Sequence, residues 1–151
     1  MAGKKAETAP ARRGRPRAYD TEAALKRATE TFWKTGYSGT SLDSIATATG
    51  MNPPSLYAAF GNKRGLYLEA LARYWEISLA ATREALSEDR PLAESLMLAY
   101  EAALSIYFSG KGNARGCFVV GTAVTEAGDD AAIRSNVAAG LRMIDADFEA
   151  R

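Results

Sequence analysis

Residues 40–63 read TSLDSIATATGMNPPSLYAAFGNK, and this stretch decides the fold because it contains two short helices and the turn between them. Thr40 is a hydroxyl residue at a helix start, with Asp43 three residues on, where an acid complements the free N–H groups and the dipole of the first turn. Gly50 stands where the chain must leave the helix with a positive φ. The pattern predicts a first helix that begins near Thr40 and ends at a tight turn at Gly50.

A second short helix follows that turn. Asn52 is a candidate N-cap, and the two prolines at 53–54 fit a first helical turn, where a missing N–H has no cost. The helix ends near Phe60, because Gly61 interrupts it and Asn62 can cap a third helix. Two short helices joined by a glycine turn favour a helix-turn-helix that presents one helix end to the major groove of DNA. Ordinary helical domains also contain such turns, so the spacing alone leaves a purely structural interpretation open.

The composition is that of an ordinary globular protein, and the charge is unevenly distributed. The 151 residues are 47% hydrophobic and 25% charged, with a formal net charge of +1. Residues 1–17 hold six Lys or Arg and one Glu, whereas residues 65–151 hold eight against thirteen Asp or Glu. A basic N-terminus before an acidic body indicates an arm for a polyanion, with a merely solvated tail as the alternative.

Residues 1–18 are too poor in large apolar side chains to order themselves, and we expect them to be disordered without DNA. Within them, residues 13–17 read RGRPR, which resembles the core of an AT-hook, a segment whose arginines enter the narrow minor groove of A·T-rich DNA. The arm therefore offers four candidate minor-groove residues: Arg12, Arg13, Arg15 and Arg17.

Several classes of function find no support in the sequence. There is no histidine, no phosphate-cradling glycine-rich loop and no cluster of metal ligands, so we expect neither an enzyme nor a bound metal or cofactor. The acidic pair at 129–130 is better explained as a helix start than as a metal site. The single Cys117 permits no internal disulfide. Without a signal peptide or an 18-residue apolar run, the expected location is cytoplasmic.

The flanking sequence predicts further helices and no sheet, which makes the expected fold all-α. Asp20 caps a first helix that ends at Gly36. A long helix from Lys63 to about residue 87 is apolar on two sides, so it should be buried between layers and link the helix-turn-helix to the rest. A helix from Pro91 to about residue 109 is apolar around most of its circumference and is predicted to be a core helix.

The C-terminal part is expected to hold two more helices. Residues 117–127 form a short apolar helix closed by Gly128, and Asp129 or Asp130 caps a last helix. The apolar stripe of that helix is formed by Ile133, Val137, Leu141, Ile144 and Phe148. The helix runs to Arg151 without a stop signal, so we expect the sequence to be a piece of a longer protein.

Residues 19–74 resemble the DNA-binding domain of the tetracycline-repressor (TetR) family of bacterial transcriptional regulators. The residues that fall in the family's usual order and spacing are Phe32, Gly36, Tyr37, Thr40, Ile45, Ala46, Gly50, Leu56, Tyr57, Phe60, Lys63 and Leu66. The remainder, including residues 115–118, is similar to the family's more variable ligand-binding domain. The resemblance implies an arm at 1–18, a helix-turn-helix domain at 19–64 and a partial effector-binding and dimerisation domain at 65–151.

The resemblance also implies an all-helical repressor that binds a palindromic operator as a homodimer and is released by a small molecule. In the family, positions 40, 57 and 63 usually hold the DNA backbone, and the hydroxyl of Thr40, the phenol of Tyr57 and the ammonium of Lys63 can each reach a phosphate. Base reading falls to the start of the second helix, to Asn52, Pro53, Pro54, Ser55 and Ala58. The two prolines depart from the family's pattern, so we expect few direct hydrogen bonds to bases. The alternative for Asn52 and Ser55 is that they only cap the helix.

The candidate effector-pocket residues are the aromatic and sulfur-containing side chains of the later helices, which suggest a hydrophobic or aromatic effector. They are Trp75, Tyr100, Tyr107, Phe108, Cys117 and Phe118, with ordinary core packing as the alternative for each. Cys117 is alternatively a thiol sensor, with a small buried residue as the simpler interpretation. The rival to a repressor is an architectural protein that binds A·T-rich DNA broadly, without an effector.

Overall fold

The computed structural model describes residues 20–87, 89–110 and 114–151, and all their regular structure is helical. This confirms the predicted all-α class. The elements, in chain order, are α1 (Thr21–Gly39), α2 (Leu42–Thr49), α3 (Pro53–Phe60), α4 (Lys63–Ala85), α5 (Leu92–Tyr107), α6 (Phe118–Thr122), the 3₁₀ turn η1 (Glu126–Gly128) and α7 (Ala131–Glu149). Within the described ranges, no helix combines the length and the hydropathy that crossing a bilayer requires.

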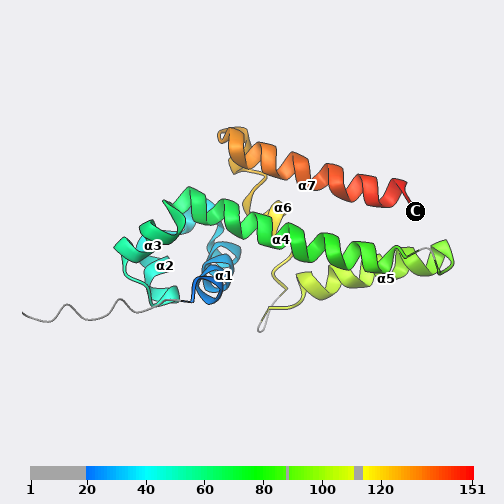
Figure 1. Cartoon of the computed structure of the whole chain (residues 1–151), viewed down its shortest axis with the longest axis horizontal. Helices are drawn as coiled ribbons and strands as arrows, with labels where there is room; N and C mark the ends of the chain where they lie inside the picture. Colours follow the sequence, from blue (N-terminus) through cyan, green and yellow to red (C-terminus); the bar gives the residue numbers. More distant parts are fainter. Residues whose placement is uncertain (1–19, 88, 111–113) are drawn as a thin grey trace, which may run out of the picture.

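The long helix α4 organises the molecule (Figure 1). The first three helices gather around its N-terminal end, α5 folds back along its second half, and α7 lies along its other side. The short helix α6 contacts both α1 and α4, where the N-terminal helices meet the later ones. The predicted link helix is therefore present, with helices packed on two sides.

Helix ends in the N-terminal unit follow the local signals closely. Asp20 caps α1 as predicted, accepting the N–H groups of residues 22 and 23, both at 3.1 Å. At Gly36, with φ 73°, the helical conformation is interrupted, and one further helical turn precedes Thr40. At the far end of α2, Gly50 has φ 71° in the left-handed region, as predicted.

The start of α2 lies one residue later than predicted. Ser41 is the N-cap, because its hydroxyl accepts the N–H of Ser44 at 3.1 Å while the hydroxyl of Ser44 accepts the N–H of Ser41 at 3.2 Å. Thr40 instead turns inward: its hydroxyl donates to the carbonyl of Gly36 at 2.6 Å and lies 2.7 Å from the hydroxyl of Thr35. This pairing ties the end of α1 to the start of α2.

The bounds of α3 are those expected from the sequence. The Oδ1 of Asn52 accepts the N–H of Ser55 at 2.9 Å, and the two prolines occupy the first turn. Gly61 ends the helix, and the Oδ1 of Asn62 accepts the N–H of Gly65 at 2.8 Å to cap α4. Caps at both ends therefore fix where α3 begins and ends.

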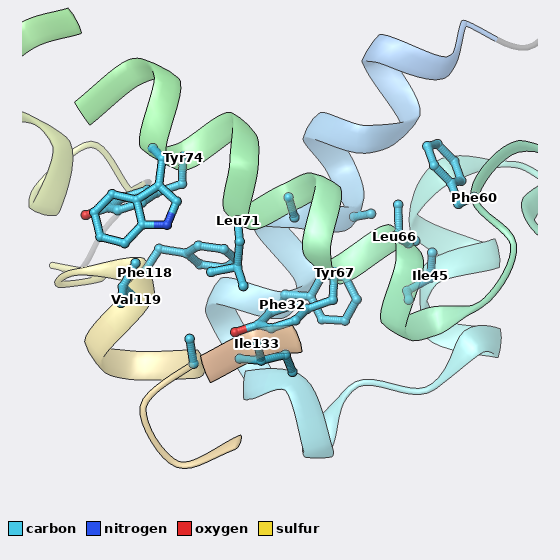
Figure 2. Close-up of a cluster of buried hydrophobic side chains, with 14 of the residues drawn as sticks. Phe32, Ile45, Phe60, Leu66, Tyr67, Leu71, Tyr74, Phe118, Val119 and Ile133 are labelled. Carbon is cyan, nitrogen blue, oxygen red and sulfur yellow. The ribbon is translucent and has the colours of Figure 1, made fainter. Parts of the chain in front are cut away.

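One cluster of buried side chains runs from the N-terminal helices into the later ones (Figure 2). Phe32, Tyr67 and Phe118 are fully buried, with ring centroids 5.0 Å apart for the first pair and 5.9 Å for the second. The Tyr67 hydroxyl lies 2.7 Å from the Oγ1 of Thr122, and burial raises the pKa of Tyr67 to about 12. Helices α1, α4 and α6 therefore share a core, and the division at residue 64 stays a prediction.

Two expectations about the later helices are wrong. Helix α5 is not a core helix, because its buried residues are the small Ser95 and Ala99 while large apolar side chains such as Tyr100 stay exposed. Helix α5 packs mainly on α4, so α4 covers only one narrow side of α5. The stretch 117–127 is split into α6 and η1, and the apolar stripe of α7 is buried only in its first half.

Asp130 is the residue that caps α7, accepting the N–H groups of residues 132 and 133.

Candidate DNA-binding surface

The outer face of α3 is exposed and its inner face is anchored. Leu56 and Phe60, one turn apart, are only 2% and 8% exposed and belong to the central cluster. Of the five residues predicted to read bases, Asn52, Pro53, Pro54 and Ala58 are exposed, and Ser55 is half-buried. The structure thus places four of the predicted base-reading residues at the N-terminal end of α3 and Ala58 in its second half.

That face is short of charge and of hydrogen-bonding groups. Helices α2 and α3 together contain one charged residue, Asp43. The Oδ1 of Asn52 is occupied by the cap, which leaves its amino group to donate. Pro53, Pro54 and Ala58 offer carbon surface, suited to contact with a thymine methyl group.

The three predicted phosphate contacts are placed differently. Tyr57 is 48% exposed on α3. Lys63 lies in the first turn of α4, where its Nζ sits 4.3 Å from the ring centroid of Tyr37, a cation–π distance. Thr40 is only 2% exposed and its hydroxyl is engaged within the protein. Of the three side chains, Tyr57 and Lys63 are therefore presented at the surface and Thr40 is not.

Behind this surface, polar contacts join the N-terminal unit to the start of α7. Arg64 donates two hydrogen bonds to the carboxylate of Asp130, at 2.5 and 2.8 Å, and they hold the pKa of that carboxyl well below its usual range. The hydroxyl of Ser38 donates to Glu126 at 2.7 Å. The sequence predicted Asp130 as a cap, but its partner lies 66 residues away, and no local pattern indicates such a pairing.

The four arginines of the predicted arm, Arg12, Arg13, Arg15 and Arg17, lie outside the described residues. Their role in the minor groove stays a prediction. Nor do the described residues place three or more His, Cys, Asp or Glu side chains where they could hold a metal ion.

The six candidate effector-pocket residues differ in exposure, and their role in binding an effector stays a prediction. Tyr100 and Phe108 are 62% and 63% exposed on α5, whereas Phe118 is fully buried in the central cluster. Trp75 faces α7, where its Nε1 donates to the Oδ1 of Asn136 at 3.0 Å. Four of the six lie around Tyr74: the ring centroids of Trp75 and Phe118 are 5.8 and 5.6 Å from that of Tyr74, and Cys117 and Tyr107 lie beside its hydroxyl. Tyr100 and Phe108 thus stand apart from the other four, on the exposed side of α5.

Cys117 takes up a structural position. Its Sγ lies 3.2 Å from the hydroxyl of Tyr74, and the residue is half-buried before α6. Burial raises the pKa of Tyr74 strongly.

A cavity of about 430 Å³ lies between α1, α4 and α5. Its apolar wall includes Leu25, Trp33, Tyr74, Ile77 and Ile106. None of the six predicted pocket residues lines it, because the prediction considered only the later helices and this cavity uses α1 as a wall.

Comparison with known proteins gives a consistent picture. The family model described as bacterial regulatory proteins, tetR family, matches residues 24–70. The transcriptional repressor ComR of Escherichia coli is 37% identical over 125 residues, which are 83% of this chain and 60% of ComR. The E. coli repressor BdcR is 36% identical over 107 residues, 71% of this chain and 54% of BdcR. The chain thus spans little more than half the length of these two relatives.

Among solved structures, the chain is similar to the TetR family transcriptional regulator CifR, as a cysteine mutant complexed with 26-bp double-strand operator DNA. One such structure has a TM-score of 0.71 and 35% identity, covering 89% of this chain and 72% of the CifR chain. A second has a TM-score of 0.70 and 36% identity, with 90% and 72% covered.

Proposed function

The chain belongs to the TetR family of bacterial regulators, and from this premise we propose that it is a transcriptional repressor that binds a palindromic operator as a homodimer. The observation that carries the proposal is the presentation of α3, whose N-terminal end is exposed while Leu56 and Phe60 hold it from behind. ComR and BdcR are named as repressors, and CifR is bound to operator DNA, which supports the same function here. A protein that acts on a bacterial operator works in the cytoplasm.

In this proposal the outer face of α3 enters the major groove. The amino group of Asn52 and the hydroxyl of Ser55 contact base edges, and Pro53, Pro54 and Ala58 contact thymine methyl groups. Tyr57 and Lys63 hold the DNA backbone and fix the register. The buried hydroxyl of Thr40 supports this surface indirectly, by fixing the start of α2.

Affinity in this proposal comes largely from the basic arm, because α2 and α3 carry no positive charge. Each phosphate contact adds about −0.9 to the slope of log affinity against log salt concentration. We expect removal of residues 1–17, with Arg13, Arg15 and Arg17, to flatten that slope by up to about three units. Arg12 lies beside them and is part of the same arm. An unchanged slope would refute the role of the arm while leaving that of α3 intact.

Selection of bound sequences from a random DNA pool, followed by footprinting, tests the whole proposal. One protected palindrome is expected, with half-sites one helical turn or about 34–36 Å apart, since a dimer presents two copies of α3 to successive major grooves. Diffuse protection of A·T tracts would instead indicate an architectural protein and overturn the repressor.

Release by a small effector completes the proposal. A hydrophobic or aromatic molecule that binds the DNA-free arrangement more tightly than the DNA-bound one lowers operator affinity by that difference in binding free energy. The long helix α4 is the element through which such a change reaches α3, because it begins directly after α3 and packs against α5 and α7.

A further inference from the structure

We propose that the cavity between α1, α4 and α5 binds a small organic acid with a flat apolar body, whose carboxylate is taken by Arg115. This inference names the site and the chemical class of the effector, and in that respect it rests on the proposed function. The volume of about 430 Å³ lies within the roughly 300–1,000 Å³ typical of small-molecule sites.

The wall around Trp33 is apolar and rigid. The Nε1 of Trp33 donates to the carbonyls of Arg115 and Gly116 at 3.1 and 3.2 Å, so the polar edge of the indole is already satisfied. The Tyr74 ring meets the indole edge-on, with centroids 5.6 Å apart. A flat apolar molecule finds aromatic surface here without leaving a buried donor unpaired.

Arg115 is held at this wall in a fixed orientation. Its Cζ lies 4.5 Å from the centroid of the Trp33 ring, and its Nη2 donates to the carbonyl of Ser109 at 3.2 Å. Among the residues that the structure describes, one buried polar side-chain atom has no hydrogen-bond partner. It is the Nε of Arg115. That Nε is shielded from solvent, so the ligand meets the part of the guanidinium that borders the cavity, and a carboxylate is the acceptor that a guanidinium binds most strongly.

The other charges that line the cavity offset one another. Arg73 forms an ion pair with Glu22 at 2.5 Å. Lys26 and Glu30 lie four residues apart on α1, a spacing at which opposite charges are neighbours. Summed over the described lining, Arg115 leaves a net positive charge, which favours an anion.

The location couples the ligand to DNA binding. One wall belongs to α1, which packs on α2 and so supports the helix-turn-helix, while the other walls belong to α4 and α5. An acid held between them contacts both units at once, and it shifts operator affinity if the arrangement of α1 against α5 differs between the two states.

Calorimetric titration of the DNA-free protein with three acids, phenylacetate, 2-naphthoate and indole-3-acetate, and with the amide of each, tests the site. At least one acid should bind saturably, and its amide should bind at least about tenfold more weakly, since a charge-assisted hydrogen bond is lost. Equal affinity of acid and amide, or no saturation by any of the acids at millimolar concentration, would overturn the proposal.

Variants locate the binding. Arg115→Gln should weaken binding of the acid at least about tenfold and remove the difference between acid and amide. Arg142→Gln, on the exposed face of α7, is the matched control and should bind as the unsubstituted protein does. Ile77→Trp fills the cavity from a half-exposed position, and it should abolish binding while Arg115 stays in place. This second variant keeps the test valid even if the Arg115→Gln protein misfolds.

Acid binding that survives both the Arg115→Gln and the Ile77→Trp substitutions would place the ligand elsewhere and overturn the assignment. Because the titrations contain no DNA, they are independent of the proposed repressor function. Operator binding is then measured separately, with and without the acid. Failure to bind any operator would refute the repressor, whereas acid binding without operator release would refute only the coupling.

Discussion

Helices α3 and α5 both expose apolar surface, but they are held in different ways. Helix α3 has a side-chain cap at Asn52, an end at Gly61 and two large buried anchors, Leu56 and Phe60. Helix α5 has no side-chain hydrogen bond at its N-cap, and its buried residues are the small Ser95 and Ala99. The exposed face of α3 is therefore presented in one defined position, as recognition of DNA requires, whereas α5 is held mainly by its contact with α4.

A matched pair of leucines tests this difference with the largest expected effect. Leu56→Ala on α3 should lower the free energy of unfolding by about 2–5 kcal/mol, because it leaves a cavity in the central cluster. Leu96→Ala on α5, at a side chain that is 44% exposed, should change it by no more than about 0.5 kcal/mol. Urea unfolding followed by circular dichroism measures both. Equal losses would show that α5 is anchored as firmly as α3.

A glycine on α7 extends the comparison to the other side of α4. A Cβ at Gly140 would lie 2.1 Å from the ring of Trp75, so Gly140→Ala forces that ring to move and should cost about 1–3 kcal/mol of stability. At Gly121 an added Cβ meets nothing within 4 Å, and Gly121→Ala is the control. If thermal unfolding shows both variants to be equally stable, α7 is packed as loosely as α5.

Two substitutions at Asn52, the N-cap of α3, distinguish an effect on stability from an effect on DNA recognition. Asn52→Ala should cost about 1 kcal/mol of stability and weaken operator binding, because both the cap and the amino group are lost. Asn52→Asp keeps an N-cap oxygen, so it should retain stability and still weaken operator binding by placing a negative charge beside DNA. Asn62→Ala, which removes the cap of α4, is the control. An Asp variant with unchanged operator affinity would remove Asn52 from the proposed interface.

The ion pair between Arg64 and Asp130 gives the smallest effect on stability, and the size of that effect depends on pH. The pKa of Asp130 is depressed in the folded state, so its contribution to stability is present above the unfolded pKa of about 3.9 and is lost as pH falls through the folded value. Asp130→Asn should therefore lower the urea midpoint at neutral pH, and the gap to the unsubstituted protein should close toward acid pH. Asp129→Asn, at the exposed neighbour, is the control. A gap that stays constant with pH would show that the charge of Asp130 does not stabilise the fold.

Local signals predicted the helix-turn-helix nearly residue by residue. Caps and glycine turns act within four or five residues, so Asn52, Gly50 and Asn62 could be assigned their roles without knowledge of the fold. The one error there, the start of α2, arose because two hydroxyl residues stand side by side and the sequence does not show which one caps the helix. The hydroxyl of Thr40 donates back to the carbonyl of Gly36 in the preceding turn, which leaves Ser41 to cap the helix.

The effector site could not be predicted in the same way. Aromatic character identified Tyr100, Phe108 and Phe118 as candidates, but the direction in which each side chain points depends on how α5 and α6 pack. The cavity that the structure shows combines Trp33 of α1 with Arg115, residues 82 positions apart that are joined by a hydrogen bond. No periodic pattern connects two such positions.

The sequence by itself determined the helical class, the ends of most helices and the basic N-terminal arm, because these depend on residues near one another in the chain. The tertiary structure alone decided which apolar side chains are buried, which charges pair across the molecule and where a cavity remains. Those features depend on contacts between residues far apart in the sequence, and only the packing of α1, α5 and α7 against α4 brings such residues together.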